Sequence, residues 1–244
     1  MASLYTQQSR NVWRTWALMA VFLCVVVALG WLAGEYFGNR AIAYIALAFA
    51  LVTNLFAYWF SDKVAIASAG AHMADEAQYR ELHRIVENLA ITAGLPKPRV
   101  YIIDDAAPNA FATGRDPKHA AIAVTTGLLS MMDRSELEGV LAHELSHVGN
   151  RDILVMTVVV VLVGFVSILA DMFMHAAWWG GGDRDDSRAG ALAAIAALAA
   201  MILAPIAAQL IQLAISRRRE YLADVSGALL TRYPEGLASA LAKI

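Results

Sequence analysis

The sequence predicts an α-helical integral membrane protein with four transmembrane helices and one small α+β domain. Of its 244 residues, 59% are hydrophobic and only 16% are charged, and the mean hydropathy is +0.54. Soluble domains contain about 45–50% apolar and about 25% charged residues, so this composition favours a membrane protein. Four segments without Asp, Glu, Lys or Arg are long enough to cross a bilayer as helices. They are residues 15–34, 41–61, 153–170 and 189–216.

The distribution of Lys and Arg predicts how the chain lies in the bilayer. Of the 19 Lys and Arg residues, only Arg40, Arg184 and Arg188 fall in segments opposite the N-terminus. Cytoplasmic segments are enriched in these residues, so we expect the N-terminus, the α+β domain and the C-terminus in the cytoplasm. The net charge of −2 gives no case for a nucleic-acid partner. The predicted parts are an N-terminal transmembrane hairpin (1–61), the cytoplasmic domain (62–152), a second transmembrane hairpin (153–216) and a cytoplasmic helix (217–244).

Two helices are expected in the cytoplasmic domain. The first is capped by Asp75, shows apolar residues at helical spacing and ends at Gly94. The second begins near Ser135, which has Glu138 three residues later in a capping-box pattern, and ends at residues 149–150.

Strands are expected between these helices, where β-branched and apolar residues gather. The last two of three such segments flank a polar turn, which predicts a hairpin or two adjacent strands. The segments are 99–104, 110–114 and 120–127.

The second helix contains the sequence H-E-L-S-H. His143 and His147 are four residues apart, so their imidazoles project from one face and can chelate a single metal ion. Glu144 then lies beside the ion, where a general base for a metal-activated water belongs. Cys24 is the only cysteine, which excludes a thiolate-rich zinc site. The alternative interpretation is a pair of helix-surface histidines near lipid headgroups.

A catalytic zinc site needs a third protein ligand. His147 precedes the third apolar run and Glu220 follows the fourth, so an antiparallel pair of membrane helices returns Glu220 to the level of His147. Asp224 lies one turn beyond Glu220 on the same face, where it can hydrogen-bond a ligating histidine. No sequence rule places the remaining histidines as ligands. They are His72, His83, His119 and His175.

These motifs, in this order, closely resemble the HtpX-type membrane zinc metalloproteases of the M48 peptidase family. The resemblance rests on HELSH, on SRRREYLAD at 216–224 after the apolar pair, and on NAFATG at 109–114 and AVTTGLL at 123–129. It implies a gluzincin-like domain with one Zn²⁺ per chain, Glu144 as the general base and Asp224 as the partner of a ligand. The ligands it implies are His143, His147 and Glu220.

The same resemblance implies a function and a location. It implies an endopeptidase of the bacterial inner membrane that cleaves misfolded or damaged membrane proteins, or unfolded proteins, on the cytoplasmic side during stress. It also implies that Asn109, Ala110, Phe111 and Ala112 form an edge to which an extended substrate adds as a strand. An ordinary hairpin is the alternative for that segment.

The sequence departs from the pattern of this family at the C-terminus. Related proteins usually continue past the equivalent of Ile244 and carry a His-Pro element, so the sequence is expected to be C-terminally incomplete. A non-catalytic zinc-binding membrane adaptor, or an inactive truncated protease, is therefore the competing hypothesis. Glu144 argues against it, because a structural zinc does not need that residue. A transporter is disfavoured because the apolar runs lack ionisable residues.

Overall fold

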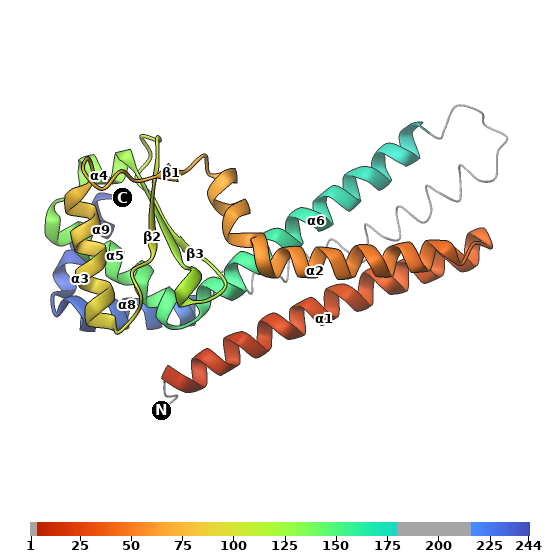
Figure 1. Ribbon diagram of the computed structural model, residues 1–244, viewed down its shortest axis with the longest axis horizontal. Helices are drawn as coiled ribbons and strands as arrows, with labels where there is room; N and C mark the ends of the chain where they lie inside the picture. Colours follow the sequence, from red (N-terminus) through yellow and green to blue (C-terminus); the bar gives the residue numbers. More distant parts are fainter. Residues whose placement is uncertain (1–3, 180–215) are drawn as a thin grey trace. The chain divides into compact units, whose positions relative to one another are not determined.

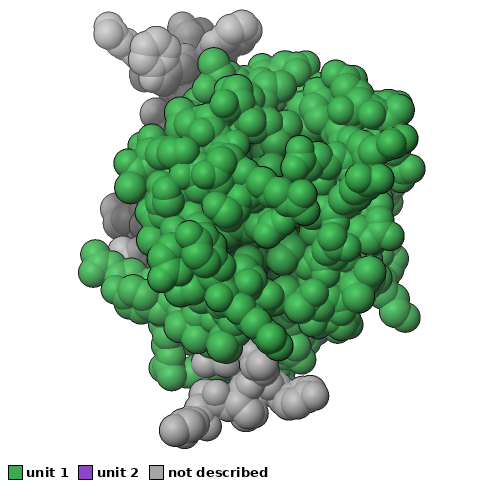
Figure 2. Space-filling view, turned by 90° about the vertical axis from the view of Figure 1, so that its left-hand side faces the viewer, with its two compact units in different colours: residues 1–15, 59–157, 216–244 green, residues 16–58, 158–215 purple. Residues whose placement is uncertain are grey.

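The computed structural model describes residues 4–179 and 216–244, and the chain divides into two units (Figure 1). Unit 1 contains residues 1–15, 59–157 and 216–244, and unit 2 contains residues 16–58 and 158–215. Figure 2 shows one face of unit 1, in green. Three separate stretches of the sequence therefore build unit 1.

Long apolar helices pass through unit 2. They are α1 (Leu4–Phe37), α2 (Ala41–Ser68) and α6 (Asp152–Trp179). In the described residues, Gln8–Glu35 and Ala41–Ser68 are each long and apolar enough to cross a membrane. The helix Arg134–Gly149 and residues Asp152–Ile168 meet this criterion only together, as a pair bent by 82°. The described residues therefore contain two candidate spans, or three if the bent pair forms a single span.

Helices α1 and α2 contain the first two predicted apolar runs, and α6 contains the third. The fourth predicted run, 189–216, lies outside the described residues except for Ser216, so four transmembrane helices stay a prediction. Inside unit 2, Asn54 donates its side-chain N–H to the carbonyl of Met19 at 3.0 Å. Many outward side chains are large and apolar, such as Val52, which is 64% exposed. An apolar exterior around hydrogen-bonded helices suits a lipid environment.

A four-stranded sheet forms the centre of unit 1. Its strands are β1 (His72–Met73), β2 (Arg99–Ile103), β3 (Ala110–Thr113) and β4 (Ala121–Thr125). The order is β1-β2-β4-β3, with β2 parallel to β4 and the other two pairs antiparallel. The prediction of adjacent strands at 110–114 and 120–127 is confirmed. The sheet leaves β3 at an edge.

Helices cover one side of this sheet, as Figure 1 shows. They are α3 (Arg80–Ala93), α5 (Arg134–Gly149), α8 (Arg217–Thr231) and α9 (Pro234–Lys243). The short α4 (Thr126–Met131) and a 3₁₀ turn (Pro117–His119) complete the unit. Ile122 of β4 and Leu141 of α5 have no exposed surface and belong to the same core. On the other side, Ile66 of α2 packs against Ala121 and Ala123.

The start of each predicted helix differs from expectation. Asp75 accepts the backbone N–H of Gln78 at 2.8 Å in a turn, and α3 begins only at Arg80. The capping box of α5 is formed by Asp133 and Glu136, so its assignment to Ser135 and Glu138 was wrong by two residues. Two overlapping patterns of the same form occur here, and spacing alone does not distinguish them. The predicted ends, at Gly94 and at residues 149–150, are confirmed.

The buried carboxylate of Glu136 also joins α5 to α9. It accepts a hydrogen bond from the Ser239 hydroxyl at 2.6 Å and pairs with the Lys243 ammonium at 2.5 Å. The hydrogen bond from Lys243, followed by that from Ser239, lowers the pKa of Glu136. Beside this contact, a Cβ on Gly139 would lie 2.6 Å from the backbone nitrogen of Leu237. Glycine at 139 therefore lets the two helix backbones approach closely.

We predict that Gly139→Ala lowers the free energy of unfolding by about 1–3 kcal/mol, because the added methyl group pushes against rigid backbone. The measurement is denaturant or thermal unfolding of the detergent-purified chain. Gly149→Ala is the matched control, since a Cβ there meets only Leu95 Cδ1 at 3.6 Å, an ordinary contact. Equal stability of the two variants would contradict the close approach of α5 and α9.

Candidate metal centre

The side chains of His143, His147 and Glu220 converge on one point between α5 and α8. The His143 Nε2 atom lies 3.2 Å from His147 Nε2 and 3.5 Å from Glu220 Oε2. His147 Nε2 lies 3.7 Å from the same oxygen. Among the described residues, this group has the ligand atoms and the mutual distances, all within 4.8 Å, that could hold a metal ion.

The donor set and its spacing fit a tetrahedral zinc site. Two imidazole nitrogens and one carboxylate oxygen are ligands that catalytic zinc uses, and they leave a fourth position open. Ligands at about 2.0–2.1 Å from a tetrahedral ion lie about 3.3–3.4 Å apart. The three separations of 3.2–3.7 Å are close to this value. Only small side-chain shifts would be needed to accept the ion.

Carboxylates face the remaining nitrogen of each histidine. Asp224 Oδ1 lies 2.9 Å from His143 Nδ1, a charge contact whose angle does not meet hydrogen-bond geometry. His147 Nδ1 is hydrogen-bonded to Asp152 Oδ2 at 3.2 Å. Such partners fix the ring orientation and the tautomer of a metal-binding histidine. Sequence reasoning singled out Asp224 and missed Asp152, although an acidic residue at the start of an apolar run was a usable signal.

Asp152 is itself held by the beginning of α1. Asn11 donates its side-chain N–H to Asp152 Oδ1 at 2.6 Å and to the carbonyl of Asn150 at 3.0 Å. Gln8 donates to the carbonyl of Gly149 at 2.7 Å. These bonds satisfy carbonyls at the C-terminus of α5, which a helix cannot pair internally. Asn11, which lies 136 positions before His147 in the sequence, therefore helps to position that histidine.

Glu144 lies next to the three converging residues and contacts the edge strand. Its Oε2 accepts the backbone N–H of Ala112 at 2.9 Å. Desolvation by the surrounding protein raises the pKa of Glu144 to about 7, although the positive charge of His147 acts to lower it. A carboxylate that titrates near neutral pH can both accept and return a proton.

The charges of the metal-free site are strongly coupled. Burial lowers the pKa of His147, but the hydrogen bond to Asp152 and the nearby carboxylate of Glu220 outweigh it and raise this pKa to about 10. The close approach of His147 lowers the pKa of Glu220. Burial and the charge of His147 lower the pKa of His143. His147 therefore carries a proton at neutral pH that a metal ion must displace.

The other predicted residues fall in two places. Asn109 donates its backbone N–H to Thr125 Oγ1 at 2.9 Å and leads into β3, which contains Ala110, Phe111 and Ala112. The remaining histidines with described side chains have partners away from the centre. His72 lies 3.8 Å from Asp104, His83 Nε2 lies 3.1 Å from the Ala74 carbonyl, and His119 bonds Asp116 at 2.8 Å.

A helix with two histidines around a glutamate, a glutamate from a second helix, and apolar helices in the same chain define a membrane metalloprotease. The sequence profile of the family described as "Peptidase family M48" matches residues 76–244. The chain belongs to this family, and it is a metalloprotease of the HtpX type.

Relatives from bacteria and archaea support this assignment. The "Protease HtpX homolog" of Caldanaerobacter subterraneus subsp. tengcongensis is 48% identical over 99% of this chain and 83% of its own length. The protein of the same description in Thermoanaerobacter pseudethanolicus is 49% identical, also over 99% of this chain and 83% of its own length. That of Pyrococcus furiosus is 50% identical over 95% of this chain and 78% of its own length.

We predict that Asp152→Asn weakens Zn²⁺ binding by about 10–100-fold, because the amide no longer fixes the imidazole of His147. The measurement is competition with a chromophoric chelator. Asp116→Asn, on the exposed turn after β3, is the control and should bind as tightly as the unaltered chain. An unchanged affinity in Asp152→Asn would show that His147 keeps its orientation without Asp152.

A second prediction concerns pH. Because one proton on His147 must leave, the apparent affinity for Zn²⁺ should rise about tenfold per pH unit between about pH 6 and pH 9. The direction follows from a folded-state pKa of about 10, above this range. Chelator competition in a pH series measures the slope, and an affinity independent of pH would contradict a protonated His147.

Proposed function

We propose that this chain is a zinc-dependent endopeptidase that hydrolyses misfolded, damaged or unfolded membrane proteins on the cytoplasmic side of the cell membrane. The observation that carries the proposal is the position of Glu144 beside the convergent His143, His147 and Glu220. A structural zinc site needs no such base, and this favours catalysis over a zinc-binding adaptor. The concentration of Lys and Arg in the segments on the N-terminal side of the predicted spans supports the cytoplasmic side.

In this proposal His143, His147 and Glu220 hold the ion, and zinc is favoured over other divalent metals by the two imidazoles and one carboxylate. When bound, the ion supplies a Lewis acid that polarises the scissile carbonyl and lowers the pKa of a water molecule. Asp224 and Asp152 keep the two imidazoles in the orientation that presents Nε2 to the site.

Glu144 performs the proton transfers. Its carboxylate takes a proton from the attacking water as the new bond between oxygen and the carbonyl carbon forms. It then gives that proton to the amide nitrogen as the bond between carbon and nitrogen breaks, so that a carboxylate and an amine are released. The pKa of about 7 in the metal-free protein supports this double role.

The substrate is proposed to lie along β3 as an added strand, in contact with Asn109, Ala110, Phe111 and Ala112. The edge position of β3 supports this, as does the hydrogen bond from Ala112 to Glu144. A strand bound there would bring its backbone close to the proposed base. Recognition through backbone groups suits unfolded substrates, because every extended chain presents them.

We predict that Glu144→Gln lowers the rate of peptide-bond cleavage by at least about 10²–10⁴-fold and leaves Zn²⁺ bound, because the amide cannot accept the proton. The measurement is cleavage of an unfolded protein by the detergent-purified chain, after chelator treatment and addition of Zn²⁺. The metal content of each variant is determined in parallel. If the chain binds Zn²⁺ and neither protein cleaves, the adaptor hypothesis replaces the protease.

Glu220→Ala should weaken Zn²⁺ binding itself, and cleavage should fall with it unless Zn²⁺ is in large excess. Glu138→Ala, which removes a half-buried glutamate of α5 that pairs with Arg134, is the matched control and should leave both unchanged. Chelator competition gives the affinity for each variant. An unaltered affinity in Glu220→Ala would remove this residue from the ligand set.

A further inference from the structure

A second site lies at the end of α2, built from residues that the proposed proteolysis does not use. A cavity of about 440 Å³ is lined by residues that include Trp59, Lys63, Arg99, Arg115 and Lys118. They come from α2, from β2 and from the connection between β3 and β4, and all belong to unit 1. This basic cleft brings four cationic side chains together.

Neighbouring carboxylates neutralise only part of this charge. Asp62 Oδ2 pairs with Arg99 at 2.7 Å. Asp116 lies 3.6 Å from Arg115 and bonds His119 at 2.8 Å. Lys63 and Lys118 are exposed and have no carboxylate partner among the described residues. The basic cleft therefore keeps an excess of positive charge, which would attract an anion.

The guanidinium of Arg115 and the turn that carries Lys118 are also held in place before any ligand arrives. His119 Nε2 lies 2.8 Å from an Arg115 guanidinium nitrogen, while its Nδ1 bonds Asp116. Asp116 in turn accepts the backbone N–H groups of Lys118 and His119, which fixes the 3₁₀ turn. A cleft with a fixed guanidinium and a fixed turn binds an anion at a smaller cost in conformational entropy than a mobile loop does.

The position of the basic cleft along α2 indicates which kind of molecule carries the anionic group. The uncharged run of α2 ends at residue 61, so Trp59 and Phe60 lie at its end and Lys63 follows it within one helical turn. Trp59 is 48% exposed and Phe60 is 44% exposed. The Lys63 ammonium lies 5.2 Å from the centre of the Phe60 ring. Exposed aromatic residues followed by Lys are typical of the level of lipid headgroups.

We propose that the basic cleft binds the phosphate of an anionic phospholipid headgroup, with Lys63 and Lys118 as its principal cationic contacts. Basic pockets beside membrane helices on the cytoplasmic side bind headgroups of this kind. An acidic peptide would match the charge but not the exposed aromatic residues beside it. Binding would attach the turn that follows β3, and with it the edge strand, to the bilayer surface.

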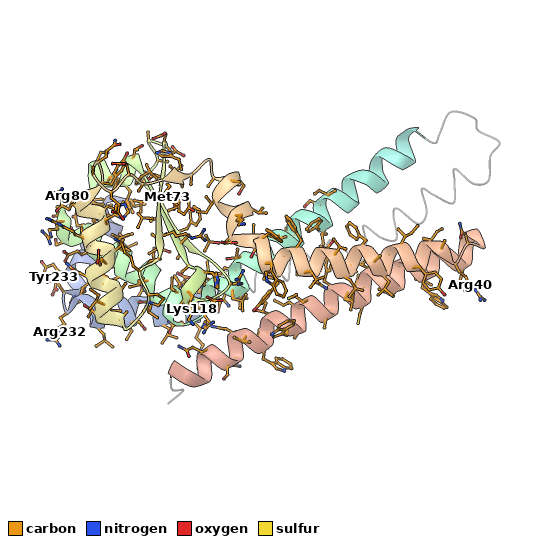
Figure 3. The ribbon with its side chains drawn as sticks, viewed as in Figure 1. Arg40, Met73, Arg80, Lys118, Arg232 and Tyr233 are labelled. Atoms are coloured by element: carbon orange, nitrogen blue, oxygen red, sulfur yellow. The ribbon has the colours of Figure 1, made fainter. Side chains whose placement is uncertain are left out.

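The test uses the full chain in detergent, titrated with phosphatidylglycerol and, separately, with phosphatidylcholine. Native mass spectrometry counts the lipids that stay bound. We expect preferential retention of phosphatidylglycerol, weakened about fivefold by each of Lys63→Gln and Lys118→Gln, the effect of one charge near a membrane surface. Arg80→Gln with Arg84→Gln removes two charges from α3, and Figure 3 shows Arg80 well apart from Lys118. This control should retain the lipid.

Three outcomes would overturn the proposal. Equal retention by the Lys63→Gln/Lys118→Gln variant would remove the basic cleft as the site. An equal loss in the α3 control would mean that net charge alone attracts the lipid. Inorganic phosphate or a polyglutamate peptide binding as tightly as phosphatidylglycerol would identify a free phosphate or an acidic protein as the ligand. Unchanged thermal unfolding of the variants shows that each one is folded, since both lysines are exposed.

Discussion

The close contact between α5 and α8 is the constraint on which the candidate metal centre depends. Glu220, Asp224 and Gly227 recur at helical spacing on one face of α8, and this face lies against His143. A Cβ at residue 227 would lie 3.0 Å from the backbone nitrogen of His143, so glycine lets the backbones approach this closely. With the helices further apart, the carboxylate of Glu220 would not reach both imidazoles.

A buried charge network extends this constraint to other parts of unit 1. Asp152 has no exposed surface, and its carboxylate lies between His147, Asn11 and Arg219. A buried carboxylate is costly unless it is paired and hydrogen-bonded, so the network is stable only when these segments meet. The beginning of α1, the start of α6 and the start of α8 are thereby joined at one residue. The histidine that Asp152 orients is positioned by all three.

The parts of the site that sequence could predict are those that depend on local spacing. His143 and His147 share a face because α-helices place residues four apart on one side, and the prediction of Glu220 rested on an expected return of the chain across the membrane. The role of Asn11 escaped prediction because its hydrogen bond to Asp152 joins residues 141 apart in sequence. The two-residue β1 is too short to show an alternating pattern, and the parallel pairing of β2 with β4 depends on tertiary packing.

Strand β3 contributes both to the position of the proposed base and to the proposed binding of substrate. Its Ala112 N–H donates a hydrogen bond to the carboxylate of Glu144 at 2.9 Å, so the proposed base is positioned by the same strand that would bind substrate. Because β3 lies at the edge of the sheet, an added strand lengthens the sheet without breaking a described pairing. An extended chain bound there lies beside Glu144 whatever its side chains are. Placement of the scissile bond would then depend on backbone register, which suits the proposed action on many unfolded sequences.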